Sequence, residues 1–368
     1  MRPGSVDFAT RVVQWQADHG RNDLPWQNTR DPYRVWLSEI MLQQTQVATV
    51  KAYYARFLAQ CPTVAALAAA SQDAVLGLWS GLGYYSRARN LHRCAQQVMQ
   101  LHGGEFPREA ATLATLPGIG PSTAAAIASL CFGERVAILD ANVKRVVARV
   151  QGYEGDVAVA AHGRALWAAA SALLPSEARA GQDMARYTQG MMDLGAMVCT
   201  PRNPLCSQCP VQACCVAQRQ GGPERYPVRS RKTRRSSQAL WLLWAQCASG
   251  EVWLGRRPSP GIWGGLYCLP LFDSEAALRA VLDAKANAAL QCEPPRTHVL
   301  THKDLYLHAC RLTLASSKAG KAPFEQALAQ APLAVRGEGG AWFSASQWPT
   351  LGLPAPVRKL LEREGSAS

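Results

Sequence analysis

The sequence predicts a mainly α-helical protein that continues, in its last third, into a smaller α+β domain. Two observations carry this prediction. Through the first two thirds of the chain, apolar residues recur three or four positions apart between Pro and Gly residues, the spacing that lines one face of a helix. After Cys215 the pattern changes to short apolar and aromatic runs that are typical of strands. A chain of 368 residues has room for two or three domains.

The helical part has a clear entry signal. Asp31-Pro32 precedes residues 36–57, where apolar side chains recur at near-helical spacing. Further segments follow, rich in Ala and mostly separated by Pro or Gly: 63–79, 86–102, 109–115, 121–132, 141–151, 160–174 and 183–197. We therefore expect seven to nine short helices and no strand in this part.

A basic stretch separates the two parts. Residues 225–235 carry six Lys or Arg and no acid, which is typical of a solvated linker, so we place a boundary near 222–237. Beyond it, the pattern predicts three strands and two helices. The strands are expected at 239–247, 251–255 and 305–314, and the helices at 274–288 and 354–364.

The chain carries a strong positive charge, because 39 Lys and Arg against 26 Asp and Glu leave +13. This excess favours a polyanionic partner, with nucleic acid first and an anionic membrane surface second. No apolar stretch reaches the ~18 residues of a membrane span. The N-terminal residues lack the apolar run of about 7–15 residues that a signal peptide shows. These features disfavour membrane-embedded and secreted classes, and we expect a bacterial cytoplasmic, nucleoid-associated protein.

Cysteine usage points to a metal. Seven of the twelve cysteines are scattered in apolar contexts, where a lone thiol is usually a small buried hydrophobe. The other five crowd into residues 199–215, and Cys199, Cys206, Cys209 and Cys215 can converge on one centre. Zinc and a 4Fe–4S cluster both accept four sulfurs, and the presence of a single C-x2-C pair favours iron–sulfur. Unrelated buried cysteines are the alternative, and Cys214 is the spare thiol.

A second signal is the turn Leu116–Gly120, which contains Gly118 and Gly120 and leads into Pro121. Two glycines suit a tight hairpin, and Pro suits the first position of a helix. The exposed backbone N–H groups at such a helix start can bind a DNA phosphate. Without other context, an ordinary connection between two helices is the simpler interpretation.

Two carboxylates form the third signal. Glu39 lies in the apolar-rich stretch 36–46, where burial would raise its pKa and suit it to donate a proton. Asp140 follows the apolar run 136–139 and precedes a predicted helix. The simpler interpretations are a solvated helix residue for Glu39 and a helix N-cap for Asp140, and capping is compatible with catalysis.

These motifs together resemble a known superfamily. LPGIGPSTAAAIASL (116–130) resembles the helix-hairpin-helix of the endonuclease III superfamily of DNA glycosylases. ILDANVKRVVARV (138–150) resembles the segment that carries its aspartate, and the spacing C-x6-C-x2-C-x5-C is similar to its 4Fe–4S signature. Within that superfamily, five further segments resemble the MutY family of adenine glycosylases. They are LPWQ (24–27), WLSEIMLQQTQVATV (36–50), GLGYYSRARNLH (81–92), MMDLGAMVC (191–199) and GIWGGLYCLP (261–270).

The resemblance implies a helix-hairpin-helix glycosylase fold of two helical lobes with an iron–sulfur loop, followed by an α+β Nudix-like domain. Residues 1–28 and 138–222 would form the cluster domain and 29–137 a six-helix domain with the hairpin. Residues 223–237 would be a basic linker, and 238–366 a domain that recognises 8-oxoguanine. The implied cofactor is a 4Fe–4S cluster held by the four cysteines.

The resemblance also implies the activity, which is removal of adenine mispaired with 8-oxoguanine or guanine in double-stranded DNA. Glu39 would protonate the adenine, and Asp140 would stabilise the oxocarbenium-like sugar, a division of labour that sugar hydrolases share. Ser122 stands where the lyase members carry a nucleophilic lysine. Because a hydroxyl cannot form a Schiff base, we expect a monofunctional glycosylase without β-lyase activity.

Other residues take roles only through the resemblance. The adenine pocket would comprise Arg21, Leu24, Trp26, Ser122 and Gln189. Contacts to DNA would come from the wedge residues Gln43 and Tyr84, from Gly118 and Gly120, and from Lys144 and Arg145. The loop residues Leu300, Thr301 and His302 would recognise 8-oxoguanine, although Leu300 replaces the Phe and Thr301 the Ser of the family.

Two other functions compete with this interpretation. An endonuclease III-like pyrimidine glycosylase with lyase activity is disfavoured by Ser122 and by the C-terminal domain. A non-catalytic iron–sulfur DNA-binding protein would not need both Glu39 and Asp140. Residues 271–295 lack the Glu-rich magnesium box of Nudix hydrolases, so pyrophosphatase activity is not expected. We expect a monomer that acts on DNA.

Overall fold

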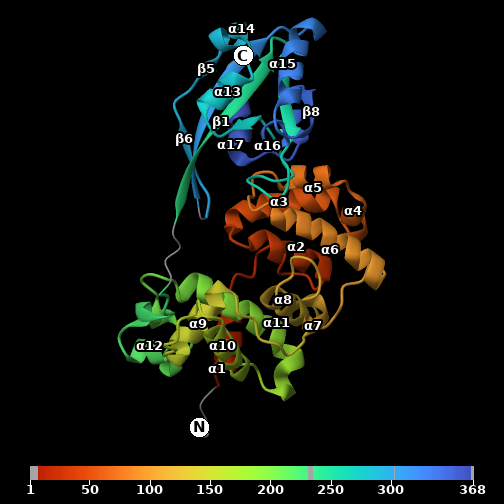
Figure 1. Ribbon diagram of the computed structural model, residues 1–368. Coiled ribbons are helices and arrows are strands. Elements are labelled where there is room, and N and C mark those ends of the chain that lie inside the picture. Colours follow the sequence, from red (N-terminus) through yellow and green to blue (C-terminus); the bar gives the residue numbers. More distant parts are fainter. Residues whose placement is uncertain (1–6, 231–234, 302, 366–368) are drawn as a thin grey trace. The chain divides into compact units, whose positions relative to one another are not determined.

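The computed structural model describes residues 7–230, 235–301 and 303–365 of the chain. These residues separate into two compact units, whose elements Figure 1 shows in chain order. The described residues of Met1–Ala69 and Asn90–Lys232 form the first, which we call the helical unit. Those of Ala70–Arg89 and Thr233–Ser368 form the second, which we call the mixed unit. Residues 231–234 of the predicted linker lie outside the described residues, and the predicted domain boundaries stay predictions.

The helical unit is built from helices joined by short turns. Its elements are α1 (Phe8–His19), α2 (Pro32–Leu42), α3 (Val47–Gln60), α4 (Val64–Ala69), most of α6 (Ser86–His102), α7 (Ala110–Leu113), α8 (Pro121–Phe132), α9 (Ala141–Gln151), α10 (Ala160–Ala172), α11 (Glu177–Asp193), a π-helix (Leu194–Val198) and α12 (Val216–Arg219). With α5 (Gln72–Trp79), twelve α-helices precede the first strand in the described residues, and no strand lies among them, as predicted. The predicted number was too low for two reasons. The predicted segments 36–57 and 63–79 each contain two helices, and α1 and α12 were not predicted.

Local signals start these helices where the sequence predicts. Asp31 caps α2 by accepting a bond from the Tyr33 amide at 2.9 Å, and Pro32 takes the first helical position. Pro121 likewise begins α8, which ends at Gly133 in the left-handed conformation. The apolar faces of α1, α9 and α11 then pack together around buried residues such as Val12, Val146 and Met184. This core supports the residues of the candidate site.

The mixed unit is an eight-stranded sheet with helices on both faces. Its strands are β1 (Ser236–Cys247), β2 (Val252–Arg256), β3 (Tyr267–Cys268), β4 (Leu271–Phe272), β5 (Gln291–Cys292), β6 (Arg296–Val299), β7 (Lys303–Leu314) and β8 (Glu338–Phe343). The central path runs β3-β2-β1-β7-β5, while β4 pairs with β1, β6 with β7 and β8 with β2. Strands β1 and β7 are parallel from Ser236↔Lys303 to Cys247↔Leu314, and the other pairs are antiparallel.

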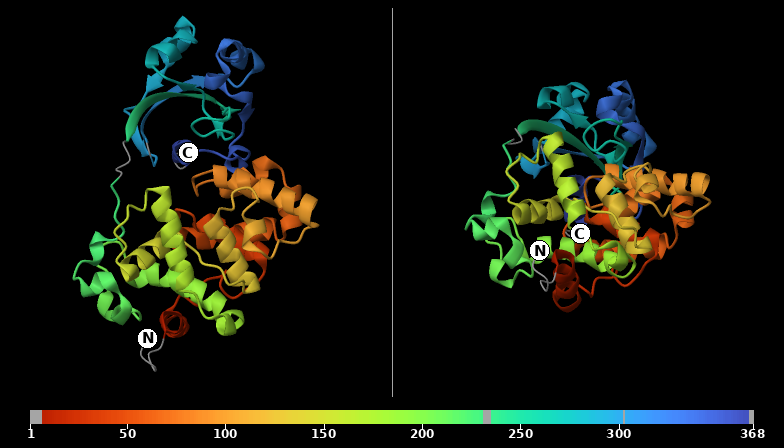
Figure 2. Two further views of the ribbon diagram at one scale, coloured as in Figure 1. Left: turned by 60° about the horizontal axis from the view of Figure 1, so that its bottom comes forward. Right: turned by 90° about the horizontal axis from the view of Figure 1, so that it is seen from below.

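Alternation along β1 divides the core of the mixed unit. Leu240, Leu242 and Trp244 face α17 (Ala355–Gly365), whereas Leu243 and Ala245 face the helices on the other side. Those helices are α13 (Glu275–Ala280), α14 (Ala284–Ala289) and α15 (Lys318–Gln330), which Figure 2 shows across the sheet from α17. A short α16 (Leu333–Arg336) follows α15. No helix of the described residues has the length and apolar character that crossing a membrane requires.

Several features of the mixed unit differ from the predictions. Three strands were expected beyond the linker, and the described residues contain eight. The helix expected at 274–288 is two helices, because Asp283 caps α14 and interrupts the first one. Helix α15, which contains Pro323, was not predicted. The expectation of isolated buried thiols was wrong for Cys292 and Cys310, which form a disulfide. The antiparallel register of β5 and β7 places these two residues opposite each other, and only the fold sets that register.

Candidate active site and metal centre

One cavity of the helical unit, about 600 Å³ in volume, brings the two predicted catalytic carboxyl groups together. Glu39 reaches it from α2, and Asp140 from the residue before α9. The same wall contains the five residues predicted for the adenine pocket and one predicted wedge residue: Arg21, Leu24, Trp26, Ser122, Gln189 and Gln43. The volume lies within the range of small-molecule sites, roughly 300–1,000 Å³. The cavity can therefore accept a nucleoside.

Glu39 has the environment of a general acid. Burial raises the pKa of this carboxyl from 4.5 to about 7, and the Asp140 carboxylate adds to the rise. Within the described chain, no hydrogen bond reaches the Glu39 carboxyl. The side chain also lines a second, polar cavity of about 370 Å³, so it keeps access to water. A carboxyl that is partly protonated near neutral pH can donate a proton to a bound base.

Asp140 combines the predicted cap with a place at the cavity. Its carboxylate accepts a bond from the Val143 amide at 2.7 Å and so caps α9. Burial raises the pKa of Asp140, while bonds from the Val143 and Asn142 amides oppose the rise. The cap holds the carboxyl group rigidly beside the cavity, which suits it to interact with a charge that develops there.

Ser122 supports the segment that carries Asp140. The Ser122 hydroxyl accepts a bond from the Leu139 amide at 3.0 Å and so ties the start of α8 to the residue before Asp140. It also lines the cavity, where none of the described wall residues is a lysine. The wall therefore offers no amine that could form a Schiff base.

Asp193 is a site residue that the sequence analysis missed. Its fully buried carboxylate (0% exposed) pairs with the Arg21 guanidinium at 2.6 Å and accepts a bond from the Gln189 amide at 3.0 Å. It also accepts a bond from the Arg21 backbone amide at 3.1 Å. Asp193 thereby fixes two residues of the cavity wall. The sequence could have identified Asp193, because a lone acid within the apolar stretch 191–198 needs a cationic partner when it is buried.

The glycine turn forms the predicted hairpin between α7 and α8. Gly118 has a φ of +78°, and a Cβ there would lie 2.7 Å from the Cβ of Asn90, so only glycine fits. Gly120 is the N-cap residue of α8 and has open space around the position of a Cβ. The turn thus leaves the amides at the start of α8 free of side-chain caps.

The two predicted phosphate contacts on α9 differ in their surroundings. Lys144 is half-buried, and no side-chain bond to it is found in the described residues. Arg145 is only 8% exposed and donates to the carbonyl oxygens of Gly195 at 2.6 Å and Cys199 at 2.7 Å. Its guanidinium holds the π-helix and the start of the cysteine segment, which disfavours a phosphate contact through this side chain.

The four predicted cysteine ligands line one small pocket, together with Arg149. In the described residues no three His, Cys, Asp or Glu side chains are drawn together as a closed metal site. The donors nevertheless suit an iron–sulfur cluster, since Cys199, Cys206, Cys209 and Cys215 surround the pocket and the spare thiol Cys214 does not line it.

Arg149 is a second residue that the sequence analysis missed. It is 1% exposed and donates to four carbonyl oxygens, those of Thr200 and Pro201 among them, at 2.7 and 3.0 Å. It also donates to the Cys199 sulfur at 3.3 Å. A buried guanidinium beside sulfur would stabilise the negative charge of metal-bound thiolates.

The predicted lesion contacts lie in the mixed unit. Tyr84 is 46% exposed, and its hydroxyl is 2.8 Å from the Thr301 hydroxyl. Leu300 is half-buried against the sheet core, so it packs inward and is not a free wedge. His302 lies outside the described residues.

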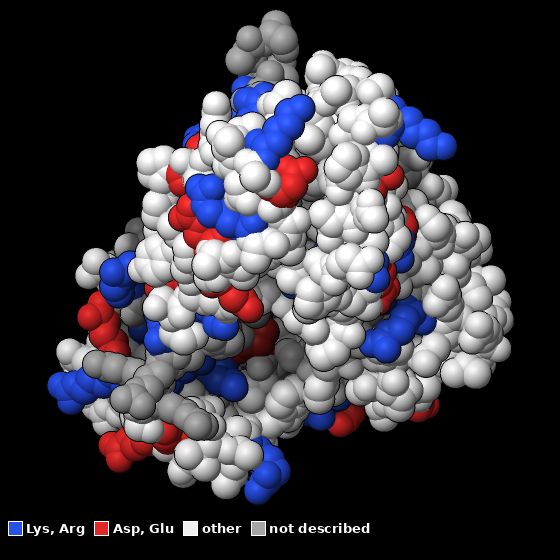
Figure 3. Space-filling model, turned by 45° about the horizontal axis from the view of Figure 1, so that its top comes forward, with Lys and Arg blue, Asp and Glu red and all other residues white. Residues whose placement is uncertain are grey.

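The face of the molecule drawn in Figure 3 has no concentrated basic patch. On the face in Figure 3, Lys and Arg side chains are scattered, and several lie beside Asp or Glu. The excess of 13 positive charges is thus not gathered on this face.

Comparison with known proteins gives matches for both parts of the chain. Residues 37–169 match the HhH-GPD superfamily of base excision DNA repair proteins, and residues 240–363 match the NUDIX domain. A solved thermostable thymine-DNA glycosylase has a TM-score of 0.51 and 30% identity, covering 58% of this chain and 95% of its own.

Two curated relatives are adenine DNA glycosylases. That of Buchnera aphidicola subsp. Acyrthosiphon pisum is 33% identical over 358 residues, which cover 96% of this chain and 97% of the relative. That of Homo sapiens is 45% identical over 219 residues, which cover 57% of this chain and 39% of the relative. These matches confirm a helix-hairpin-helix glycosylase with a Nudix-like C-terminal domain. The chain belongs to the MutY family of adenine DNA glycosylases, enzymes of base-excision repair.

Proposed function

We propose that this chain hydrolyses the N-glycosidic bond of adenine mispaired with 8-oxoguanine or guanine in double-stranded DNA. The observation that carries the proposal is one cavity of about 600 Å³ in which Glu39, with a pKa of about 7, lies near Asp140. An acid that is partly protonated and a second carboxylate nearby are the two groups that cleavage of a glycosidic bond requires. The target adenine would leave the base stack and enter this cavity, at a cost of a few kcal/mol.

The two carboxyl groups would act in sequence. Protonated Glu39 donates its proton to N7 of adenine, which makes the base a neutral leaving group when the bond between C1′ and N9 breaks. Asp140 stabilises the cationic sugar that remains. A water molecule adds to C1′, and its proton passes to the Glu39 carboxylate, which restores the acid. Positioned proton transfer accounts for about 10²–10⁴ of the rate.

The pocket residues would hold the base while this happens. Gln189 is oriented by Asp193 and can bond the polar edge of adenine. Trp26 offers an aromatic wall, which packs edge-on against Tyr54 with ring centroids 5.3 Å apart. Arg21, fixed by the same Asp193, and Leu24 complete the pocket.

We propose that the enzyme is monofunctional. A lyase needs an amine that attacks C1′ and forms a Schiff base. Ser122 lines the cavity where such an amine would act, and its hydroxyl is bonded to the Leu139 amide. The sugar would therefore be released as an abasic site.

We also propose that Cys199, Cys206, Cys209 and Cys215 hold a 4Fe–4S cluster. When bound, the cluster would cross-link four points of the segment 199–215 and so keep it folded. Arg149 supports this assignment, because its guanidinium lies beside the Cys199 sulfur and ties the backbone on both sides of the pocket. Purified protein should contain about four irons per chain and absorb broadly near 400 nm, as a cluster with four Cys ligands does.

Contacts with DNA would be shared between the units. The amides of the Gly118–Gly120 hairpin and Lys144 would bind phosphates, and Gln43 and Tyr84 would wedge into the duplex. Thr301, with His302, would hydrogen-bond 8-oxoguanine, so we assign lesion recognition to a domain spanning 238–366. The enzyme would act as a monomer. Because chromosomal DNA is the substrate, we place it in the bacterial cytoplasm, on the nucleoid.

One assay separates this proposal from its competitors. Single-turnover reactions use duplexes with adenine opposite 8-oxoguanine, adenine opposite guanine, or thymine glycol, each read with and without alkali and with borohydride. We expect strand breaks only with alkali, only from the adenine duplexes, and no borohydride-trapped complex. Glu39→Gln should abolish cleavage while the exposed-site control Glu105→Gln does not. Cleavage of thymine glycol with trapping would establish the lyase instead, and inactivity on all duplexes would establish a non-catalytic protein.

A further inference from the structure

The turn that carries Tyr84 has a conformation that it cannot easily hold by itself. Gly81, Gly83 and Tyr84 have φ values of +104°, +74° and +48°. The left-handed region is unfavourable for a bulky side chain, and Tyr84 is also 46% exposed and so gains little from packing. Within the adjoining helices, the Trp79 indole and the Arg87 guanidinium donate to the Gly83 carbonyl oxygen at 3.1 and 3.2 Å. Further contacts with the turn come from the C-terminal segment.

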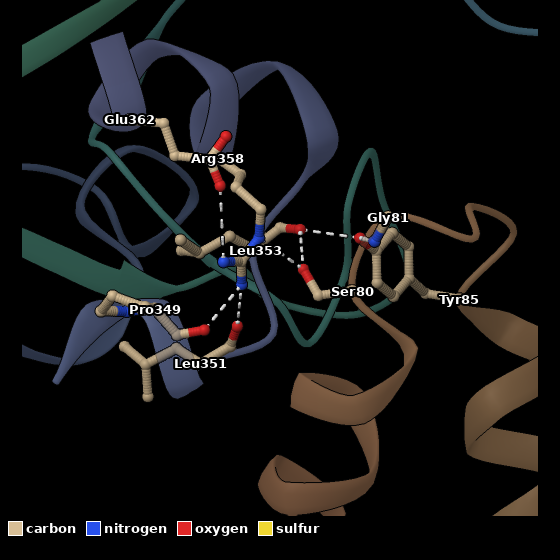
Figure 4. A network of polar contacts seen from close by, with 8 residues as sticks. All are labelled: Ser80, Gly81, Tyr85, Pro349, Leu351, Leu353, Arg358 and Glu362. Atoms are coloured by element: carbon tan, nitrogen blue, oxygen red, sulfur yellow. Dashed lines mark hydrogen bonds and ion pairs between the residues drawn. The ribbon is translucent and has the colours of Figure 1, made fainter. Parts of the chain in front are cut away.

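One carbonyl group of the C-terminal segment makes these contacts. The Leu353 oxygen accepts bonds from the Ser80 hydroxyl at 3.1 Å and from the Tyr85 hydroxyl at 2.7 Å. The Tyr85 hydroxyl oxygen in turn accepts a hydrogen bond from the Gly81 backbone amide at 3.2 Å. As Figure 4 shows, residues on both sides of Tyr84 meet at the same atom. The two ends of the turn are thus held together by a residue more than 250 positions away.

Arg358, on α17, orients this meeting point. Its Nε donates to the Ser80 hydroxyl at 3.0 Å, and its Nη2 donates to the carbonyl oxygens of Pro349 and Leu351 at 3.0 and 2.9 Å. Since Ser80 is 6% exposed and accepts from Arg358, its own proton is directed to Leu353. Arg358 therefore holds segment 349–353 and the turn in one arrangement (Figure 4).

The two segments also pack without spare room. A Cβ at Gly77 would overlap the Thr350 carbonyl oxygen, and one at Gly352 would lie 2.7 Å from the Cβ of Leu76. The Gly352 oxygen accepts a bond from the Tyr267 amide at 2.9 Å, which joins this contact to β3. Helix α5 and the sheet thus belong to the same compact unit as the turn.

We propose that Leu353 and Arg358 are positioning residues for Tyr84. They hold the turn 80–85 in the one conformation that presents the tyrosine to the duplex, although neither residue needs to touch DNA. The C-terminal part would therefore have a task besides lesion recognition, which is to set the wedge that acts beside the mispair. This inference rests on the proposed role of Tyr84 in the proposed function.

Two measurements on the full-length protein test the inference. The first is amide hydrogen exchange at residues 80–85 without DNA, which needs no activity. Arg358→Met should accelerate this exchange by about tenfold, equivalent to about 1.4 kcal/mol. The matched control Arg363→Met removes the same charge from the same helix, where no contact with the turn exists in the described residues, and should leave the exchange unchanged.

The second measurement is single-turnover excision of adenine opposite 8-oxoguanine in a double-mutant cycle. Arg358→Met should slow excision by roughly 10- to 100-fold, because a displacement of about 1 Å in a positioned group has effects of that size. In a Tyr84→Ala background the same change should cost less than about twofold, since the group that it positions is gone. Tyr85→Phe removes a single hydroxyl and repeats the test if Arg358→Met does not fold.

The inference would be overturned if Arg358→Met slowed excision by the same factor in the Tyr84→Ala background as in the wild type. It would also be overturned if Arg363→Met slowed excision as much as Arg358→Met does. Unchanged exchange at residues 80–85 would overturn it as well. If the wild-type protein excises no adenine, the proposed function fails, while the exchange measurement still decides whether Arg358 fixes the turn.

Discussion

Replacing Glu39 by Gln should slow adenine excision by about 10²–10⁴ and, at alkaline pH, stabilise the fold. Burial raises the pKa of Glu39 from 4.5 to about 7, so the folded protein binds this proton more tightly than the unfolded chain does. Above pH 7 the folded wild type must hold a partly buried carboxylate that no described residue bonds. The Gln side chain has the same shape and carries no charge.

The size of the effect follows from the pKa. A rise in the pKa of Glu39 from 4.5 to about 7 corresponds to about 3 kcal/mol, because each pKa unit is equivalent to ~1.4 kcal/mol. A group with a raised pKa contributes its full stability below the unfolded value, and this contribution is lost as the pH rises through the folded value. Glu39→Gln should therefore exceed the wild type by up to about 3 kcal/mol at pH 8, and by less than about 1 kcal/mol at pH 4.5.

Urea unfolding at pH 4.5, 6 and 8 measures this difference, and single-turnover excision measures the loss of the acid, about 10²–10⁴ in rate. In the wild type the excision rate should fall as the pH rises above about 7, because the Glu39 carboxyl then loses the proton that it must donate. Glu105→Gln, which alters an exposed acid, should change stability by less than about 0.5 kcal/mol at every pH. A stability difference that is the same at pH 4.5 and pH 8 would refute the reasoning, as would excision by Glu39→Gln at the wild-type rate.

Three further changes test other parts of the site. Ser122→Lys should form a covalent protein–DNA complex that borohydride traps and that denaturing gels detect. If no such complex forms, a side chain at position 122 does not reach C1′. Gly118→Ala should lose about 1–3 kcal/mol in urea unfolding and weaken DNA binding, whereas Gly133→Ala, with a similar φ but open space, should lose only about 1 kcal/mol and bind DNA normally. Arg149→Met should lower the iron content and the absorbance near 400 nm; full iron occupancy would show that the guanidinium is dispensable.

Much of the site could be predicted because its motifs are local. Asp31-Pro32 and Pro121 specify helix starts through bonds and dihedral angles within a few residues. The spacing of the four cysteines likewise brings their thiols to one pocket within seventeen residues. The resemblance to a family then paired residues that lie far apart in the sequence. Glu39 and Asp140, which it paired, do line the same cavity.

The sequence by itself determined where many of the helices and the three longest predicted strand runs lie, and which chemical groups they carry, because capping, periodicity and ligand spacing act over short distances. Only the tertiary structure decided which distant groups meet. The pairing of Arg21 with Asp193, the disulfide between strands β5 and β7, and the attachment of residues 70–89 to the C-terminal sheet all depend on long-range packing. The raised pKa of Glu39 likewise depends on the folded core, because residues from several segments together bury this carboxyl group and exclude water from it.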